Sequence, residues 1–146
     1  MQAVQTQDLA LTQFTQDADE RARVRGTFPV FRDTGAASTA VVYFELAPGD
    51  HLARHTDSAE ELLVVLEGKG EALVGDERAR VRAGGIVVVP AMVPHGMANV
   101  GDGPLRVAGC FSANTIVSVV DEAIAEAGSR VIGTPPPAAA HAGTAA

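Results

Sequence analysis

The sequence predicts an all-β protein, an antiparallel sandwich or barrel of about seven or eight short strands. Two observations support this fold class. Runs of β-branched residues recur at short intervals, and turn-forming sequences such as PGD, EGKG, RAGG and GDG separate them. The length of 146 residues, with 47% hydrophobic and 20% charged residues, is that of one globular domain with a single core.

The apolar, β-branched runs are the expected strands. In chain order they cover residues 40–46, 61–66, 71–74, 79–81, 86–89, 105–111 and 115–120. Residues 121–127 (DEAIAEA) can form one or two helical turns or continue the preceding strand. The runs ELLVVL and IVVVP are apolar at every position, so we expect the core to cover one face and an arm or a partner subunit the other.

The two ends of the chain differ from the middle in composition. Residues 1–25 are polar and include five glutamines, which predicts an N-terminal arm outside the core. Residues 133–146 (GTPPPAAAHAGTAA) contain three consecutive prolines and few large apolar side chains, which predicts a disordered Pro/Ala-rich tail. A β-barrel domain over residues 26–132 remains.

Charge and apolar run length exclude several classes of partner. With 11 Lys and Arg against 18 Asp and Glu, the net charge is −7, so we expect neither nucleic acid nor an anionic membrane as a partner. The longest near-continuous apolar run, residues 86–94, is far shorter than the roughly 20 residues of a membrane-spanning helix. The N-terminus lacks a basic signal region, and the single cysteine, Cys110, cannot form an internal disulfide, which favours the cytoplasm. The two-sided apolar strands and exposed sheet edges predict a homodimer.

Three of the four histidines are candidates for a site, because His141 falls in the predicted tail. His55 and Asp57 are two residues apart, so in a strand they share a face about 6.6 Å apart and can converge on one ion. His51 has the same parity but lies about 13 Å from His55 along a strand, so we expect it outside the site.

A buried carboxylate and a histidine on a rigid turn complete the candidates. Either Glu60 or Glu61 points inward at the start of an apolar strand, where a carboxylate without a partner costs several kcal/mol. His95 follows a turn bracketed by Pro90 and Pro94, which suits an aimed side chain.

These residues and their spacing resemble the two sequence motifs of the cupin superfamily. The first motif, G-x5-H-x-H-x3,4-E-x6-G, is met by Gly49, His55, Glu61 and Gly68, with Asp57 in place of the second histidine. The second, G-x5-P-x-G-x2-H-x3-N, is met by Gly84, Pro90, His95 and Asn99, with Met92 in place of the central glycine. The resemblance covers residues 40–110.

The resemblance implies a double-stranded β-helix, the cupin-type jelly-roll barrel, with one divalent metal ion at the mouth of the barrel. The implied ligands are His55, Asp57, Glu61 and His95, and the motif selects Glu61 over Glu60. The second carboxylate favours Fe or Mn, while Ni, Zn and Cu are also compatible. If Asp57 does not bind the metal, His55, Glu61 and His95 would form a two-His, one-carboxylate ligand set. Met92 implies either a different turn or local strain of roughly 1–3 kcal/mol.

The implied function is that of a metal-dependent oxidoreductase, similar to a dioxygenase, which acts on a small apolar or aromatic substrate. In this interpretation Glu61 is a dissociable metal ligand and the catalytic proton acceptor. One alternative is a non-catalytic cupin that binds a small ligand or metal, and another is a barrel that has lost its ion. A third is suggested by His55, Asp57 and His95 with Arg106, which also resemble the iron triad and co-substrate arginine of the 2-oxoglutarate oxygenases.

Overall fold

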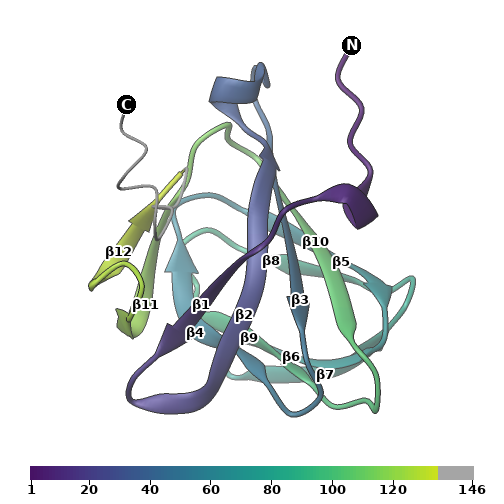
Figure 1. Ribbon diagram of the computed structural model, residues 1–146, viewed down its shortest axis with the longest axis vertical. Coiled ribbons are helices and arrows are strands. Elements are labelled where there is room, and N and C mark those ends of the chain that lie inside the picture. The colour runs from purple at the N-terminus through teal and green to yellow at the C-terminus, as the bar shows by residue number, and fades with distance from the viewer. Residues whose placement is uncertain (135–146) are drawn as a thin grey trace.

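The protein is an all-β barrel in the computed structural model, which describes residues 1–134 (Figure 1). Short 3-10 turns, η1 (Thr6–Asp8) and η2 (Arg32–Thr34), accompany the strands. The strands are β1 (Thr12–Gln16), β2 (Asp19–Val30), β3 (Ala40–Leu46), β4 (His51–Asp57), β5 (Glu61–Glu67), β6 (Lys69–Val74), β7 (Glu77–Arg82), β8 (Ile86–Val89), β9 (His95–Asn99), β10 (Leu105–Phe111), β11 (Val117–Ile124) and β12 (Ser129–Gly133). None of the described helices is long or apolar enough to span a membrane.

The strands form two facing layers that close almost into a barrel. The strand order is β7-β6-β9-β4-β2-β3-β10-β5-β8, with β1 beside β2 and the β11–β12 hairpin beside β4. Neighbouring strands pair antiparallel except at the single contact between β2 and β4. Strands from both ends of the chain therefore flank β4, the strand that carries His55 and Asp57 (Figure 1).

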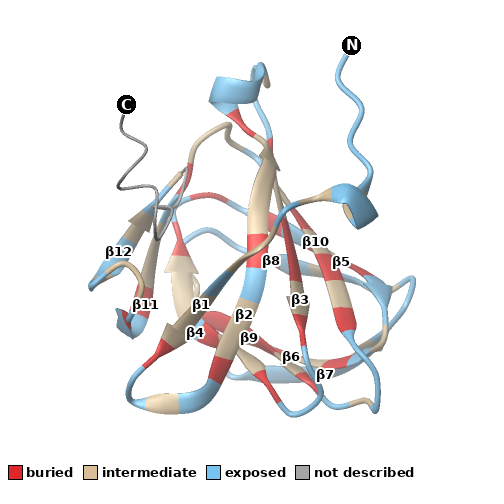
Figure 2. Ribbon diagram, viewed as in Figure 1, coloured by how far each residue is buried: buried red, intermediate tan, exposed pale blue. Residues whose placement is uncertain are grey.

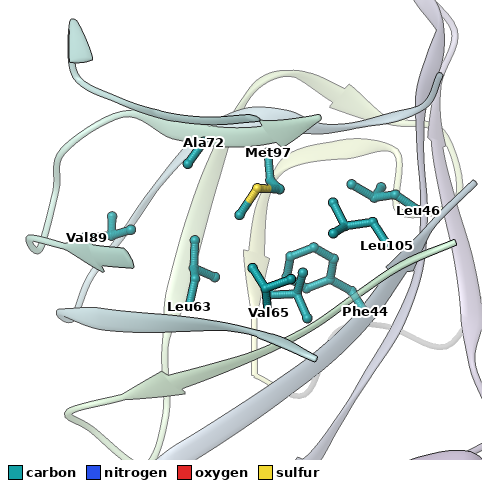
Figure 3. Packing of buried hydrophobic residues seen from close by; sticks show 9 residues of the cluster. Phe44, Leu46, Leu63, Val65, Ala72, Val89, Met97 and Leu105 are labelled. Carbon is teal, nitrogen blue, oxygen red and sulfur yellow. The ribbon is translucent and has the colours of Figure 1, made fainter. Parts of the chain in front are cut away.

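All seven predicted runs overlap strands of the barrel, whereas β4 and β9 between them were not among the predicted strands. Strands β3, β8 and β10 have the predicted bounds, because mostly apolar runs between strong turn signals define them. Residues 121–124 continue strand β11, and no helix forms there. Buried positions alternate along β10, whereas in β3 the adjacent residues Tyr43 and Phe44 are both buried (Figure 2). The inward side chains of the barrel strands pack between the layers in a cluster of Phe44, Leu46, Leu63, Val65, Ala72, Val89, Met97, Leu105 and Val107 (Figure 3).

Both ends of the barrel differ from the prediction. The predicted arm over residues 1–25 is too long, because residues 12–25 belong to strands β1 and β2. Ala22 is buried in this segment, and its apolar face was hidden in the sequence by arginines at every second position. At the other end Gly133 still belongs to β12 and Thr134 hydrogen-bonds to Ile116, whereas the remaining predicted tail, with His141, lies outside the described residues.

One heptapeptide, DERARVR, occurs twice, at residues 19–25 and 76–82, and both copies contribute to strands. In β2 the alanine and valine of the repeat face the barrel interior. In β7, at one end of the strand order, the arginines are exposed, and Arg78 and Arg80 pair with Glu71. Charged side chains on an edge strand oppose pairing with another sheet.

Candidate metal centre

Two histidine rings meet across the β4–β9 pair, each with its Nδ1 atom hydrogen-bonded to the backbone. His55 and His95 are partners in the strand register, and their ring centroids are 4.2 Å apart. Nδ1 of His55 lies 2.6 Å from the Ala53 carbonyl oxygen, and Nδ1 of His95 lies 2.9 Å from the Val93 carbonyl oxygen. Because these Nδ1 atoms donate to the backbone, each Nε2 can act as a metal ligand.

The carboxylate of Asp57 joins the two rings. Its Oδ2 lies 3.4 Å from Nε2 of His55 and 3.1 Å from Nε2 of His95. Two ligands at about 2.1 Å from one ion, in adjacent coordination positions, are themselves about 3.0–3.4 Å apart. Oδ2 of Asp57 and Nε2 of His95 are buried without any aligned hydrogen-bond partner. This trio of His55, Asp57 and His95, whose ligand atoms lie within 4.8 Å of one another, therefore fits a metal ion.

Glu61 lies next to the trio but is not one of its members. It opens strand β5, it is buried as the motif implied, and Glu60 is exposed. Oε1 of Glu61 lies 3.4 Å from Nε2 of His95, but the carboxylate is not within 4.8 Å of all three members of the trio. The structure thus brings three of the four implied ligands together and holds the fourth against one of them.

Ser118 is a site residue that the sequence reasoning missed. Strand β11 pairs with β4 so that Ser118 lies opposite Asp57, and its hydroxyl donates a 2.5 Å hydrogen bond to Oδ1 of that carboxylate. The remaining oxygen, Oδ2, faces the histidines. The motifs end before β11, so only the register of this strand pair could have indicated Ser118.

Burial and opposite charges set the protonation of the trio. Burial raises the pKa of the Asp57 carboxyl, but the two histidines and the Ser118 hydroxyl outweigh this and hold it well below its usual range. Burial also lowers the pKa of His95, yet the carboxylates of Asp57 and Glu61 raise it to about 10. Burial, with the nearby charge of Asp57, raises the pKa of Glu61. A cation is therefore favoured where these groups meet, either a proton on His95 or a metal ion.

Other residues singled out in the sequence lie away from the trio. His51 pairs with Asp19 at 2.9 Å near the surface, as expected. The co-substrate role suggested for Arg106 is wrong, because its guanidinium points away from the interior and donates to the Tyr43 hydroxyl at 2.6 Å and to Glu67. Neighbouring strand residues point to opposite faces, and Val107 takes the inward direction.

Two motif residues have structural roles. Asn99 donates to the carbonyl oxygens of Leu46 and Gly103 and so fixes two turns. Met92 has φ = 65°, so of the two implied alternatives the structure shows the strained one, with a side chain where a glycine would be relaxed.

An apolar cavity of about 140 Å³ adjoins the trio. Its walls come mainly from β2, β3, β4 and β11, and His55, Asp57, Glu61 and Ser118 contribute its polar surface together with Thr27. The apolar lining includes Phe14, Val24, Phe28, Val42, Phe44, Leu52, Ala53, Phe111, Val120, Ile124 and Ile132. A ligand in this cavity would contact the trio and a mostly hydrocarbon wall.

The fold and the trio define a β-barrel protein with a candidate metal centre beside an apolar cavity. The family model described as cupin domain matches residues 42–113, and the chain belongs to the cupin superfamily. A curated relative, an uncharacterized protein of Methanocaldococcus jannaschii, is 32% identical over 53 residues. That match covers 36% of this chain and only 42% of the relative's length.

Solved structures share the fold at low sequence identity. The oxalate decarboxylase of Lactobacillus farciminis has a TM-score of 0.68 and 18% identity, over 80% of this chain and 34% of that one. A polyketide cyclase from Streptomyces resistomycificus has a TM-score of 0.62 and 19% identity, over 76% and 78% of the two chains. The cupin domain of Cnp3 from Schizosaccharomyces pombe has a TM-score of 0.61 and 16% identity, over 76% and 73%.

Proposed function

We propose that the protein is a metal-dependent oxidoreductase of the dioxygenase type, which acts on a small apolar or aromatic substrate held in the cavity. The observation that carries this proposal is the position of the trio, whose ligand atoms converge and two of whose members, His55 and Asp57, line an apolar cavity. Among the similar structures, one is named a polyketide cyclase and another an oxalate decarboxylase, and a hydrocarbon wall suits the less charged of these two kinds of substrate.

His55, Asp57 and His95 supply three ligands, a set that favours Fe or Mn and leaves positions open for substrate or O₂. A bound metal would supply Lewis-acid and redox chemistry there. Glu61 is close enough to His95 to stay near the reacting group and to accept a proton from a substrate hydroxyl. In a dioxygenase reaction both atoms of O₂ enter the substrate, so O₂ is reduced by the substrate and no separate reductant is required.

A 2-oxoglutarate mechanism has less support. It needs a cation to hold the distal carboxylate of the co-substrate, and no described residue that lines the cavity is a lysine or arginine. Arg106, the candidate for that role, contacts Tyr43 and Glu67 on the other face of strand β10.

The test compares the wild type with His95→Ala and with a matched control, His51→Ala, which removes a histidine outside the trio. Protein purified without a histidine tag is analysed for metal, and O₂ consumption is followed with catechol as the probe substrate. We expect near-stoichiometric Fe or Mn and O₂ uptake in the wild type and the control, and loss of both in His95→Ala. Equal metal content in all three proteins would refute the metal centre. Bound metal without O₂ uptake for any of a series of small aromatic compounds would favour the non-catalytic alternative.

A further inference from the structure

We infer that the cavity selects a ligand with a single aromatic ring and one polar end, and that the polar end faces the trio. This inference rests on the proposed function and narrows its substrate class to monocyclic aromatic compounds. It depends on the composition, the size and the polarity of the cavity.

Phenylalanines dominate the wall. Four of the five phenylalanines in the chain line the cavity, each from a different strand: Phe14 on β1, Phe28 on β2, Phe44 on β3 and Phe111 on β10. Phe28 and Phe111 are stacked, with ring centroids 6.2 Å apart and planes at 20°. Aromatic rings prefer offset-stacked or edge-to-face neighbours at such distances, so a wall of this kind favours a flat ring over an aliphatic chain of equal volume.

The volume limits the ligand to about one ring. The cavity measures about 140 Å³. An engineered apolar cavity of about 150 Å³ in another protein stays dry and binds benzene. A benzene ring with a hydroxyl group directed toward the trio therefore matches the available space, whereas two fused rings would extend beyond it.

The polar groups are concentrated at one end of the ligand space. His55, Asp57, Glu61 and Ser118 form one contact network, and Thr27 is the one other polar side chain in the lining. Among the described lining residues there is no Lys, Arg, Asn, Gln, Tyr or Trp. A second charged group on the ligand would be buried without a partner, and a sugar would leave its hydroxyls without hydrogen bonds, so both are disfavoured.

Two hairpins at opposite ends of the chain supply one wall of the cavity. Phe14 comes from the β1–β2 hairpin, and Ile124 and Ile132 come from the β11–β12 hairpin. Thr15 ties the hairpins together, because its backbone N–H and hydroxyl both donate to the Glu126 carboxylate at 2.7 Å. These hydrogen bonds hold the two hairpins in place as one wall of the cavity.

Ligand binding can be measured without turnover. Benzene, phenol, naphthalene and glucose are titrated into wild-type protein that is either treated with chelator or loaded with Zn²⁺, and the phenylalanine ring signals are followed by NMR. We expect benzene and phenol to shift these signals in both forms, and phenol to bind more tightly in the loaded form. Naphthalene should bind at least about tenfold more weakly than benzene, and glucose should cause no shift. Benzene that leaves the ring signals unchanged, or naphthalene that binds as well as benzene, would overturn the inference.

A variant pair locates the binding. Val42→Phe places a ring in the cavity, whereas Val41→Phe adds the same ring to the opposite face of strand β3. Val42→Phe should weaken phenol binding at least about tenfold, and Val41→Phe by less than about twofold. Equal weakening by the two variants would contradict the assigned site, and the wild-type size series still decides if Val42→Phe does not fold. Ring binding without metal binding would refute the proposed function and keep this inference. Metal binding without ring binding would refute this inference and keep the proposed function.

Discussion

The carboxylate of Glu61 occupies the space that a side chain on Gly109 would fill. A Cβ atom built on Gly109 would overlap Oε2 of Glu61 and would lie 2.8 Å from Cγ1 of Val42. The backbone of Gly109 is not in the left-handed region, so the glycine is needed here for space. Strand β10 thus provides a recess that holds Glu61 beside His95 and outside the trio.

Replacing this glycine should move Glu61. In Gly109→Ala the new methyl group displaces the carboxylate toward the trio and presses on Val42, which should cost about 1–3 kcal/mol of unfolding free energy. We expect the absorption spectrum of the Co²⁺-substituted protein to change, because Glu61 becomes a fourth protein ligand.

Gly103→Ala is the matched control, because a Cβ on Gly103 meets nothing within 4 Å. Its unfolding free energy should stay within about 0.5 kcal/mol of the wild type, with an unchanged Co²⁺ spectrum. If Gly109→Ala also leaves the spectrum unchanged, Glu61 does not depend on the recess.

Ser118 orients the carboxylate of Asp57. In Ser118→Ala the hydrogen bond to Oδ1 is lost, and the carboxylate can rotate away from the histidines. Removing such a partner of a metal ligand lowers metal affinity by about 10–100-fold. Competition with a chromogenic chelator measures this affinity. Ser118→Thr retains a hydroxyl and should recover most of it, and an unchanged affinity in Ser118→Ala would show that the hydroxyl has no orienting role.

The two hydrogen bonds from Thr15 to the Glu126 carboxylate form a clasp between the hairpins, and this clasp should make the stability of the protein depend on pH. Partial burial raises the pKa of the Glu126 carboxyl, but the hydroxyl and backbone N–H of Thr15 outweigh this and lower it below the ordinary value of 4.5. The ionised carboxylate therefore favours the folded state above pH 4.5, and this contribution is lost as the pH falls through the lowered pKa.

Thermal unfolding of the wild type and Glu126→Gln at pH 7 and pH 3 tests the clasp. The wild type should have the higher Tm at pH 7, and the difference should shrink at pH 3. A difference that is the same at both pH values would mean that the charge of Glu126 does not matter. Glu122→Gln is a suitable control, because no contact of the Glu122 carboxylate is part of the clasp.

The strands at the two ends of the strand order, β7 and β8, expose side chains of different polarity. We propose that the apolar edge strand, β8, mediates homodimer formation. Strand β7 carries exposed arginines, whereas β8 exposes Ile86 and Val88, which are 65% and 55% accessible. Large exposed apolar side chains on a free edge favour association with a second copy.

Light scattering tests this surface. The wild type should have about twice the monomer mass of 15.0 kDa, and Val88→Lys should shift it to the monomer. Val131→Lys is the control, because Val131 is an equally exposed valine, at 56%, on strand β12. A monomeric wild type at micromolar concentration would refute the dimer.

The sequence alone predicted the barrel and proposed His55, Asp57, Glu61 and His95 as its candidate site. Strands β3, β8 and β10 were predicted with their bounds, because apolar runs between Gly, Pro and Asp turns are local signals. The pair His55 and Asp57 followed from the two-residue period of a strand, and His95 from its turn and motif.

Only the tertiary structure decided what depends on strand register. Strand β2 was missed because arginines at every second position hide a narrow apolar face that is buried only once β3 and β4 lie beside it. Strand β1, TQFTQ, was missed because Phe14 is its one large apolar residue. Ser118 reaches Asp57 across 61 residues of sequence, and Gly109 receives Glu61 from the neighbouring strand β5. Local sequence fixes which face of its own strand a residue occupies, but it carries no information about which residue of a distant strand will lie opposite, because that depends on how the whole barrel closes.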